Sequence, residues 1–364
     1  MSDQEKIVPE AEEVKTEAAE EVKETAETPV EEVKAPAEEK KAKKAKKEKA
    51  PKEKKAGGKK GLIIGAVVAA VVVVALVVLT IVMGTLSTNA YVAGDYTAAY
   101  NNSKLALFQA KGDKNIIAKA YVVEVLCKEG KYFTGAEIIK KSTLSDKEKA
   151  AIYKAEPELA LCVPGQIVTF GKYEVDNNVA NGAEDLEWIV LDVIKADGKA
   201  RALLVTKDVV ASPDGWNKLN ESNASYANSN LNSWCEEFYS ILVQNDVTLG
   251  NKLLKVSVET KDSGDPVAAY AYALSKADIE TYFVDDLAQY IKATPTAAAK
   301  AKGVTAYGKD KTAIYYLRDA GKVEGGTQWA CGINKEGVVD DGLSTTSGNY
   351  GARVCINVNL GEVK

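Results

Sequence analysis

The chain has 364 residues, a net charge of −5 and no histidine. The absence of histidine excludes Ser-His-Asp and Cys-His catalysis and any histidine-ligated metal site. The net charge conceals a strong polarity: residues 1–39 carry 14 acidic residues and 4 lysines, and residues 40–60 carry 12 lysines and 2 glutamates. The remaining residues therefore account for the whole −5. A mildly acidic body indicates that nucleic acid is not its partner.

Residues 1–60 consist almost entirely of Glu, Lys, Ala, Val, Pro and Thr, and contain no aromatic residue. Such a composition cannot bury enough apolar surface to offset the entropy lost on ordering. We therefore predict a disordered cytoplasmic tail over residues 1–60.

The stretch Gly61–Gly84 contains 24 residues and no charge. As an α-helix it would extend about 36 Å, against about 30 Å for the hydrocarbon core of a bilayer. It is predicted to be a transmembrane helix that contacts the lipid bilayer. The alternatives are a buried core helix and a signal peptide, but a preceding region of 60 residues is too long for a signal peptide.

The flanks of this stretch predict its orientation. The lysine block Lys40–Lys60 precedes it directly, whereas no basic residue follows it before Lys104. Because positive flanks remain in the cytoplasm, we expect a single-pass protein of the cell membrane, with its N-terminus inside and its C-terminal domain extracellular. The lysine block is also expected to contact anionic lipid headgroups.

Residues 85–162 are predicted to be helical. Gly94-Asp95-Tyr96 recurs 36 residues later as Gly130-Lys131-Tyr132, which resembles tetratricopeptide helix pairs with their period of about 34. Ser145 and Glu148 have the spacing of a capping box. Two copies are fewer than the three usually needed for stability, so a helical stalk is favoured over a peptide-binding groove.

A domain boundary is predicted at Val163-Pro164-Gly165, where the helical pattern ends. Residues 165–362 read as short strands with intervening helices, and Asp197-Gly198 is typical of a hairpin turn. The predicted fold class is α+β. The strands are expected at Gln166–Tyr173, Leu186–Val193, Lys199–Thr206, Ile314–Leu317, Thr327–Ile333 and Ala352–Val358.

The order of motifs in this region resembles an uncharacterised domain of bacterial, mostly Firmicute, surface proteins, recorded as a domain of unknown function. The family's Trp-Trp-Leu-Arg-Ser-Pro corresponds to Tyr315–Ala320, and its Gly-Val-Arg-Pro to Gly351–Val354, without either proline. The resemblance implies a C-type-lectin-like fold that displays a ligand-binding surface. The other matching segments are Ile167–Tyr173, Leu186–Leu191, Ala202–Lys207, Asn228–Tyr239, Ala273–Phe283 and Thr296–Tyr307.

Both arginines of these motifs, Arg318 and Arg353, occur in otherwise apolar strands. A buried arginine must be paired with acceptors. Together with Tyr315 and Tyr316, they are candidates for binding a carboxylate or a sugar. Alternatively, they pair internally with Asp319, Asp192 or loop carbonyls.

Tryptophans and cysteines supply the remaining candidates. Trp216 occurs in a turn, where an exposed ring could stack on a sugar or pack within the loop, whereas Trp188 and Trp234 are expected in the core. Cys331 and Cys355 occupy neighbouring candidate strands, and form either a disulfide or two small buried groups.

These patterns predict a membrane-anchored surface protein that binds an unknown extracellular carbohydrate, peptide or protein. The alternative is an envelope scaffold or sensor whose tail docks a cytoplasmic partner. An extracellular enzyme is the least supported class, and no cofactor or metal is expected.

Overall fold

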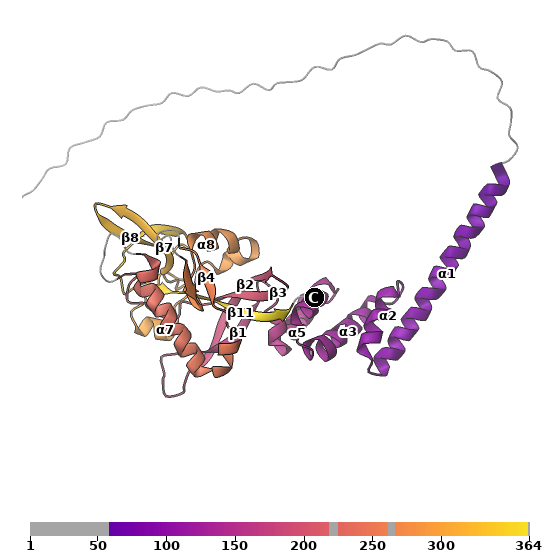
Figure 1. Ribbon diagram of the computed structural model, residues 1–364, viewed down its shortest axis with the longest axis horizontal. Helices are drawn as coiled ribbons and strands as arrows, with labels where there is room; N and C mark the ends of the chain where they lie inside the picture. The colour runs from indigo at the N-terminus through magenta and orange to yellow at the C-terminus, as the bar shows by residue number, and fades with distance from the viewer. Residues whose placement is uncertain (1–57, 218–224, 261–265, 363–364) are drawn as a thin grey trace, which may run out of the picture. The chain divides into compact units, whose positions relative to one another are not determined.

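The computed structural model describes residues 58–217, 225–260 and 266–362, with side chains from residue 68 onward (Figure 1). The predicted tail, up to residue 57, and the part of the lysine block that precedes residue 58 lie outside the described residues. The chain divides into two units, Met1–Gly61 and Leu62–Lys364, and every contact reported below lies within the second.

Helix α1, Gly58–Val92, contains the predicted transmembrane stretch. Among the described residues, Val68–Val92 of this helix is the one segment that is long and apolar enough to cross a membrane. The helix continues for eight residues past Gly84, the predicted end of the span. One side of this extension packs against the protein. Ser87 is fully buried, and its hydroxyl donates to the carbonyl of Ala99 at 2.7 Å.

The region 85–162, here called the helical segment, is helical as predicted. Both repeated glycines, Gly94 and Gly130, have positive φ angles of 80° and 71°, which glycine adopts at little cost. The capping box is confirmed, because Ser145 and Glu148 each bond the other's backbone N–H. The helices are α2 (Tyr96–Leu105), α3 (Lys111–Tyr121), the π-helical η1 (Val122–Cys127), α4 (Tyr132–Lys141), α5 (Asp146–Ala155) and α6 (Pro157–Ala160).

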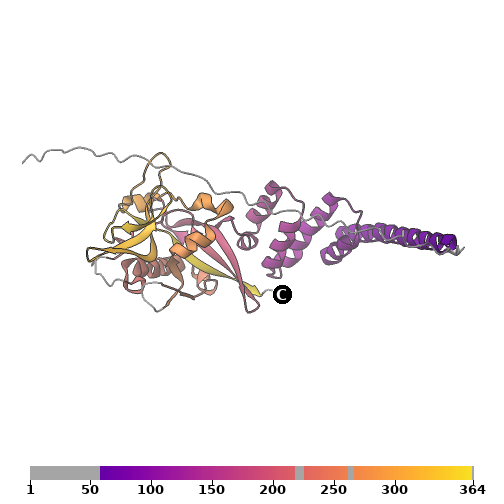
Figure 2. The same ribbon diagram turned by 90° about the horizontal axis from the view of Figure 1, so that it is seen from above.

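A five-stranded antiparallel sheet forms the centre of the C-terminal domain, in the order β1-β2-β3-β11-β6. Asp197 and Gly198 have φ angles of 52° and 71° and join β2 to β3, as a two-residue hairpin turn of this type requires. Figure 2 shows these two strands beside β11. The strands are β1 (Ile167–Tyr173), β2 (Glu184–Ala196), β3 (Lys199–Thr206), β6 (Ala271–Ala273) and β11 (Val354–Glu362).

A second sheet has the order β10-β7-β8-β9, in which β10 and β7 are parallel. Helices and strands are thus mixed, and the predicted α+β class is confirmed. The second sheet contains β7 (Tyr315–Glu324), β8 (Thr327–Ile333), β9 (Val339–Leu343) and β10 (Gly351–Ala352), and β4 (Val256–Val258) pairs with β5 (Val267–Ala269). The other helices are η2 (Tyr226–Asn228), α7 (Asn230–Asn245), η3 (Val247–Asn251), α8 (Lys276–Tyr282), η4 (Asp285–Tyr290) and α9 (Ala297–Ala301).

The five-stranded sheet buries both of its faces. Trp188 and Val190 of β2 belong to one apolar core, whereas Ile189 and Leu191 belong to another, because successive side chains of a strand point to opposite faces. The first core also contains buried residues of α4 to α7, and the second contains those of the second sheet.

The predicted boundary at Val163–Gly165 is a turn within this packed unit. The backbone N–H of Gly165 donates to the carbonyl of Val190 at 2.8 Å. Buried residues on both sides of the turn, such as Leu159 and Val168, share one core. The end of the helical segment therefore packs on the sheet, and the segment does not end as a separate stalk.

Candidate functional site

Arg318, on β7, donates to protein groups through its Nε and Nη1. Its Nε donates to the carbonyl of Glu259 at 3.0 Å, and its Nη1 donates to the carbonyl of Ala273 at 3.0 Å. Nη1 also forms an ion pair with Asp278, the residue that caps α8 by accepting the backbone N–H of Ser275. The structure therefore gives Arg318 internal partners, and its ion pair is with the carboxylate of Asp278.

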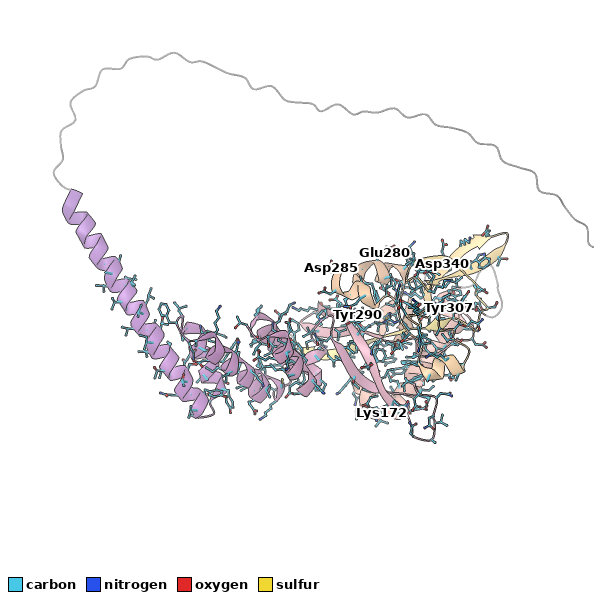
Figure 3. The ribbon with its side chains drawn as sticks, turned by 180° about the vertical axis from the view of Figure 1, so that it is seen from behind. Lys172, Glu280, Asp285, Tyr290, Tyr307 and Asp340 are labelled. Atoms are coloured by element: carbon cyan, nitrogen blue, oxygen red, sulfur yellow. The ribbon has the colours of Figure 1, made fainter. Side chains whose placement is uncertain are left out.

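Arg353 is 1% exposed and lies between two aromatic rings, 5.6 Å from Phe283 and 5.5 Å from Tyr315. Its Nε donates to the carbonyl of Thr206 at 2.9 Å, and its Nη1 donates to the carbonyl of Tyr290 at 2.8 Å. Tyr290 is labelled in Figure 3. Arg353 thus joins the end of β3 to η4.

The predicted aromatic ligand contacts are also buried. The hydroxyl of Tyr315 donates to the carbonyl of Ile291, and that of Tyr316 lies 2.7 Å from the carbonyl of Ser344. Burial raises the pKa of both phenols. With Arg318, Arg353 and Trp216, all five predicted ligand-binding residues are buried, so the structure places none of them where a ligand could reach them.

Trp216 turns inward because of the residue before it. Gly215 has a φ of 97°, and a Cβ there would lie 2.8 Å from the carbonyl oxygen of Thr345. Only glycine tolerates both conditions. The indole Nε1 of Trp216 consequently donates to the carbonyl of Leu317 at 2.8 Å. The loop-packing alternative describes Trp216 correctly.

Of the two alternatives for Cys331 and Cys355, the structure shows two small buried groups and no disulfide, and all five cysteines of the chain are free and buried. Cys331 is on β8 of the second sheet and Cys355 is on β11 of the first, so their strands are not neighbours. Burial raises the pKa of the Cys331 thiol to about 12 and that of Cys355 well above its usual value.

A polar cleft of about 420 Å³ lies beside α7, and we call it the Trp234 cleft. Ring contact with the fully buried Phe238, at 5.6 Å between centroids, holds Trp234 on its inner side. Trp234 is only partly buried, so its other side borders the cleft. The principal polar groups of the cleft come from Ser212, Asp214, Asn230, Ser233, Glu237 and Lys302.

Helix α7 positions the main groups of the cleft. Ser229 caps the helix by accepting the backbone N–H of Asn232 at 3.0 Å. Asn230, Trp234 and Glu237 then follow at spacings of four and three residues, which place them on one helix face. Trp234 does pack against both apolar cores, as the sequence predicts, but its partly exposed side and the polar groups around it are not expected from the sequence analysis.

Two other clusters are less suited to a specific ligand. A groove of about 520 Å³ between α2, α3 and α4 is lined by Lys104, Lys111, Lys114 and Lys141. The carboxylates of Glu174, Asp176 and Glu184 lie within 4.8 Å of one another. They accept backbone N–H groups of their own loop, which accounts for their convergence without a metal.

The family comparison concerns this half of the chain. Residues 200–360 match a domain of unknown function (DUF6273). The predicted resemblance to such a domain is thereby supported over these residues, although we expected it from residue 165. The DUF6273 match begins at β3 and omits β1 and β2, which pair with β3 in the same sheet. It includes α7 and most of the Trp234 cleft.

No curated protein and no solved structure matches the chain. The C-type-lectin-like fold and the bacterial origin implied by the resemblance therefore stay predictions.

Replacement of Arg318 should reveal its structural role. Arg318→Met leaves the Asp278 carboxylate without its cation, and breaking a buried pair of this kind should lower the free energy of unfolding by about 3 kcal/mol. Lys322→Met is a matched control, since that side chain is half exposed in its pair with Glu324, and the loss of an exposed pair should lower the free energy of unfolding far less. Chemical denaturation measures both, and equal effects would contradict the structural role.

The thiols should be unreactive in the folded protein. Burial raises the pKa of Cys127 to about 11 and those of Cys162 and Cys235 to about 12, so the reactive thiolate is scarce at pH 8. We expect no reaction with a thiol reagent before unfolding and five reactive thiols afterwards, without reductant. Three thiols after unfolding would instead indicate a disulfide.

Proposed function

We propose that the protein is a single-pass membrane protein whose C-terminal domain binds a carbohydrate in the Trp234 cleft. The observation that supports this function is the partly exposed Trp234 ring, surrounded by hydroxyl, amide, carboxylate and ammonium groups. Binding sites of this kind are concave, have an apolar surface and contain a few converging polar groups.

A sugar has the chemistry that suits this cleft. Its ring presents an apolar C–H face, which packs on an indole, and a rim of hydroxyl groups. Asp214 and Glu237 accept hydrogen bonds from hydroxyls, whereas Asn230 and Lys302 can donate them. A volume of about 420 Å³ falls within the usual range of small-ligand sites, roughly 300–1,000 Å³.

The proposed role is binding and not catalysis. The chain has no histidine to act as a general base, and burial raises the pKa of all five thiols. The cleft contains no cysteine among the residues that line it. The histidine-activated serine and cysteine nucleophiles of acyl-transfer enzymes are therefore not supplied there.

The proposed location is the outer face of the cell membrane. The apolar helix Val68–Val92 supports an anchor, and the twelve lysines of residues 40–60 support a cytoplasmic N-terminus. We further propose that these lysines contact anionic headgroups on the inner face.

Carbohydrate binding should depend on Trp234. In a screen of the full-length protein against a panel of soluble oligosaccharides, Trp234→Ala should weaken any ligand that binds by tenfold or more, about 1.4 kcal/mol, because the stacking surface is lost. Trp329→Ala is the control, since Trp329 is also partly buried but lies on β8. Binding that survives Trp234→Ala, with unchanged circular dichroism, would exclude the cleft, and no binding by the native protein would count against carbohydrate as the ligand.

The orientation can be tested with one introduced thiol. Val179 is 85% exposed in the C-terminal domain, and the native cysteines are buried. We expect a membrane-impermeant maleimide to label Val179→Cys in intact cells. Ser2→Cys should be labelled only after permeabilisation. The reverse pattern would contradict the proposed orientation.

A further inference from the structure

Three exposed apolar side chains lie at the end of α2 and in the connection that follows it to α3. Leu105, Leu107 and Phe108 are 57%, 67% and 69% exposed, respectively. Together with the fully buried Ala106, they form a run of four consecutive residues. Large apolar groups gathered on one short loop are a feature of interaction surfaces. We call residues 105–108 the apolar loop.

The apolar loop lies beside α1 at the C-terminal end of the predicted span. Thr80, Ile81 and Gly84 of α1 line a hollow of about 390 Å³ together with Phe108. A Cβ on Gly84 would lie 3.9 Å from the Cβ of Ala106. Figure 1 shows α2 next to the same half of α1.

The length of α1 places Thr80, and with it the apolar loop, at the surface of a bilayer. The 20 residues from Gly61 to Thr80 extend about 30 Å as a helix, which equals the thickness of the hydrocarbon core. The same level is where the rest of the protein begins to cover α1. Thr80 is 3% exposed, whereas no side chain of Val68–Leu79 is buried. Beyond it, Ser87 is buried by α2.

The neighbours of the apolar loop suit the headgroup region. Lys104 precedes the loop, and Lys111 and Lys114 follow it in α3, with no ion pair recorded for any of the three among the described residues. Basic groups beside apolar ones are typical of segments that lie in the interface.

We propose that Leu105, Leu107 and Phe108 insert into the interface of the bilayer that α1 crosses. The protein then contacts the membrane at two points, the spanning helix and the apolar loop, and the helical segment is held against the lipid surface. This inference rests on the proposed membrane anchor but not on its orientation or on carbohydrate binding.

Spin labels on introduced cysteines test the proposal. The full-length protein is reconstituted in bilayers of phosphatidylcholine and phosphatidylglycerol, with labels at Val72→Cys, Phe108→Cys and Val92→Cys, and the buried native thiols remain unlabelled. Power saturation with oxygen and with a water-soluble nickel chelate reports depth. Val72, Phe108 and Val92 are 51%, 69% and 80% exposed on the protein itself, so all three positions can carry a label.

We expect the Val72 label to favour oxygen, the Phe108 label to report the headgroup boundary, and the Val92 label, about 18 Å further along the helix than Thr80, to favour the nickel chelate. A Phe108 label as accessible to nickel as the Val92 label would overturn the proposal, while the span would stand. A Val72 label in water would instead contradict the membrane anchor itself.

A second variant separates insertion from protein packing. Leu107→Asp in the Phe108→Cys protein should raise the nickel accessibility of the label severalfold, because a charge opposes insertion. Val247→Asp, at a 76% exposed position of the C-terminal domain, should leave the label unchanged. No change with either variant would indicate that the loop is not in the membrane.

Discussion

The C-terminal domain depends on one constraint: its five-stranded sheet has apolar side chains on both faces. Leu204 of β3 and Ile356 of β11 enter the first core, whereas Val205 and Cys355 enter the second. Neither face can remain in water without exposing a large apolar area. The sheet therefore requires a cover on each side, namely α4–α7 on one and the second sheet on the other.

The two buried arginines connect these layers. Arg318 joins β7 to β6 and the start of α8, and Arg353 joins the end of β3 to η4 while contacting Tyr315 of β7. A charge in such a place costs free energy unless acceptors surround it. Carbonyl groups at loop and strand ends and the carboxylate of Asp278 supply them, so these side chains hold the layers in one arrangement. The Nη2 of Arg353 is buried and has no hydrogen-bond partner among the described residues.

The Trp234 cleft follows from this packing. Phe238 is fixed in the first core by rings of Tyr173 and Trp188, and it supports Trp234 from below. The outer side of α7 can then present an aromatic surface with polar neighbours. At the opposite end of the described chain, the apolar loop and α1 form a separate surface whose chemistry is that of a lipid interface.

Local patterns in the sequence were sufficient for much of the architecture. The long apolar helix, the capping box of Ser145 and Glu148, the Asp197-Gly198 hairpin and strands such as Lys199–Thr206 appear as predicted, because each depends on residues close together in the chain. The α+β class followed from the same patterns.

The order of the strands and the exposure of individual side chains were not predictable in this way. β11 pairs with β3, about 150 residues earlier, and Trp216 finds its carbonyl acceptor 101 residues away. Trp216 is expected in a turn, and it is buried because Gly215 lets the backbone of Thr345 approach closely. Trp234 is expected in the core, and one side of it borders a cleft. Periodicity reports only which face of an element is apolar. Which groups meet across the fold is decided by long-range packing, and this is why tertiary structure moved the candidate site from the two arginines to the surface of α7.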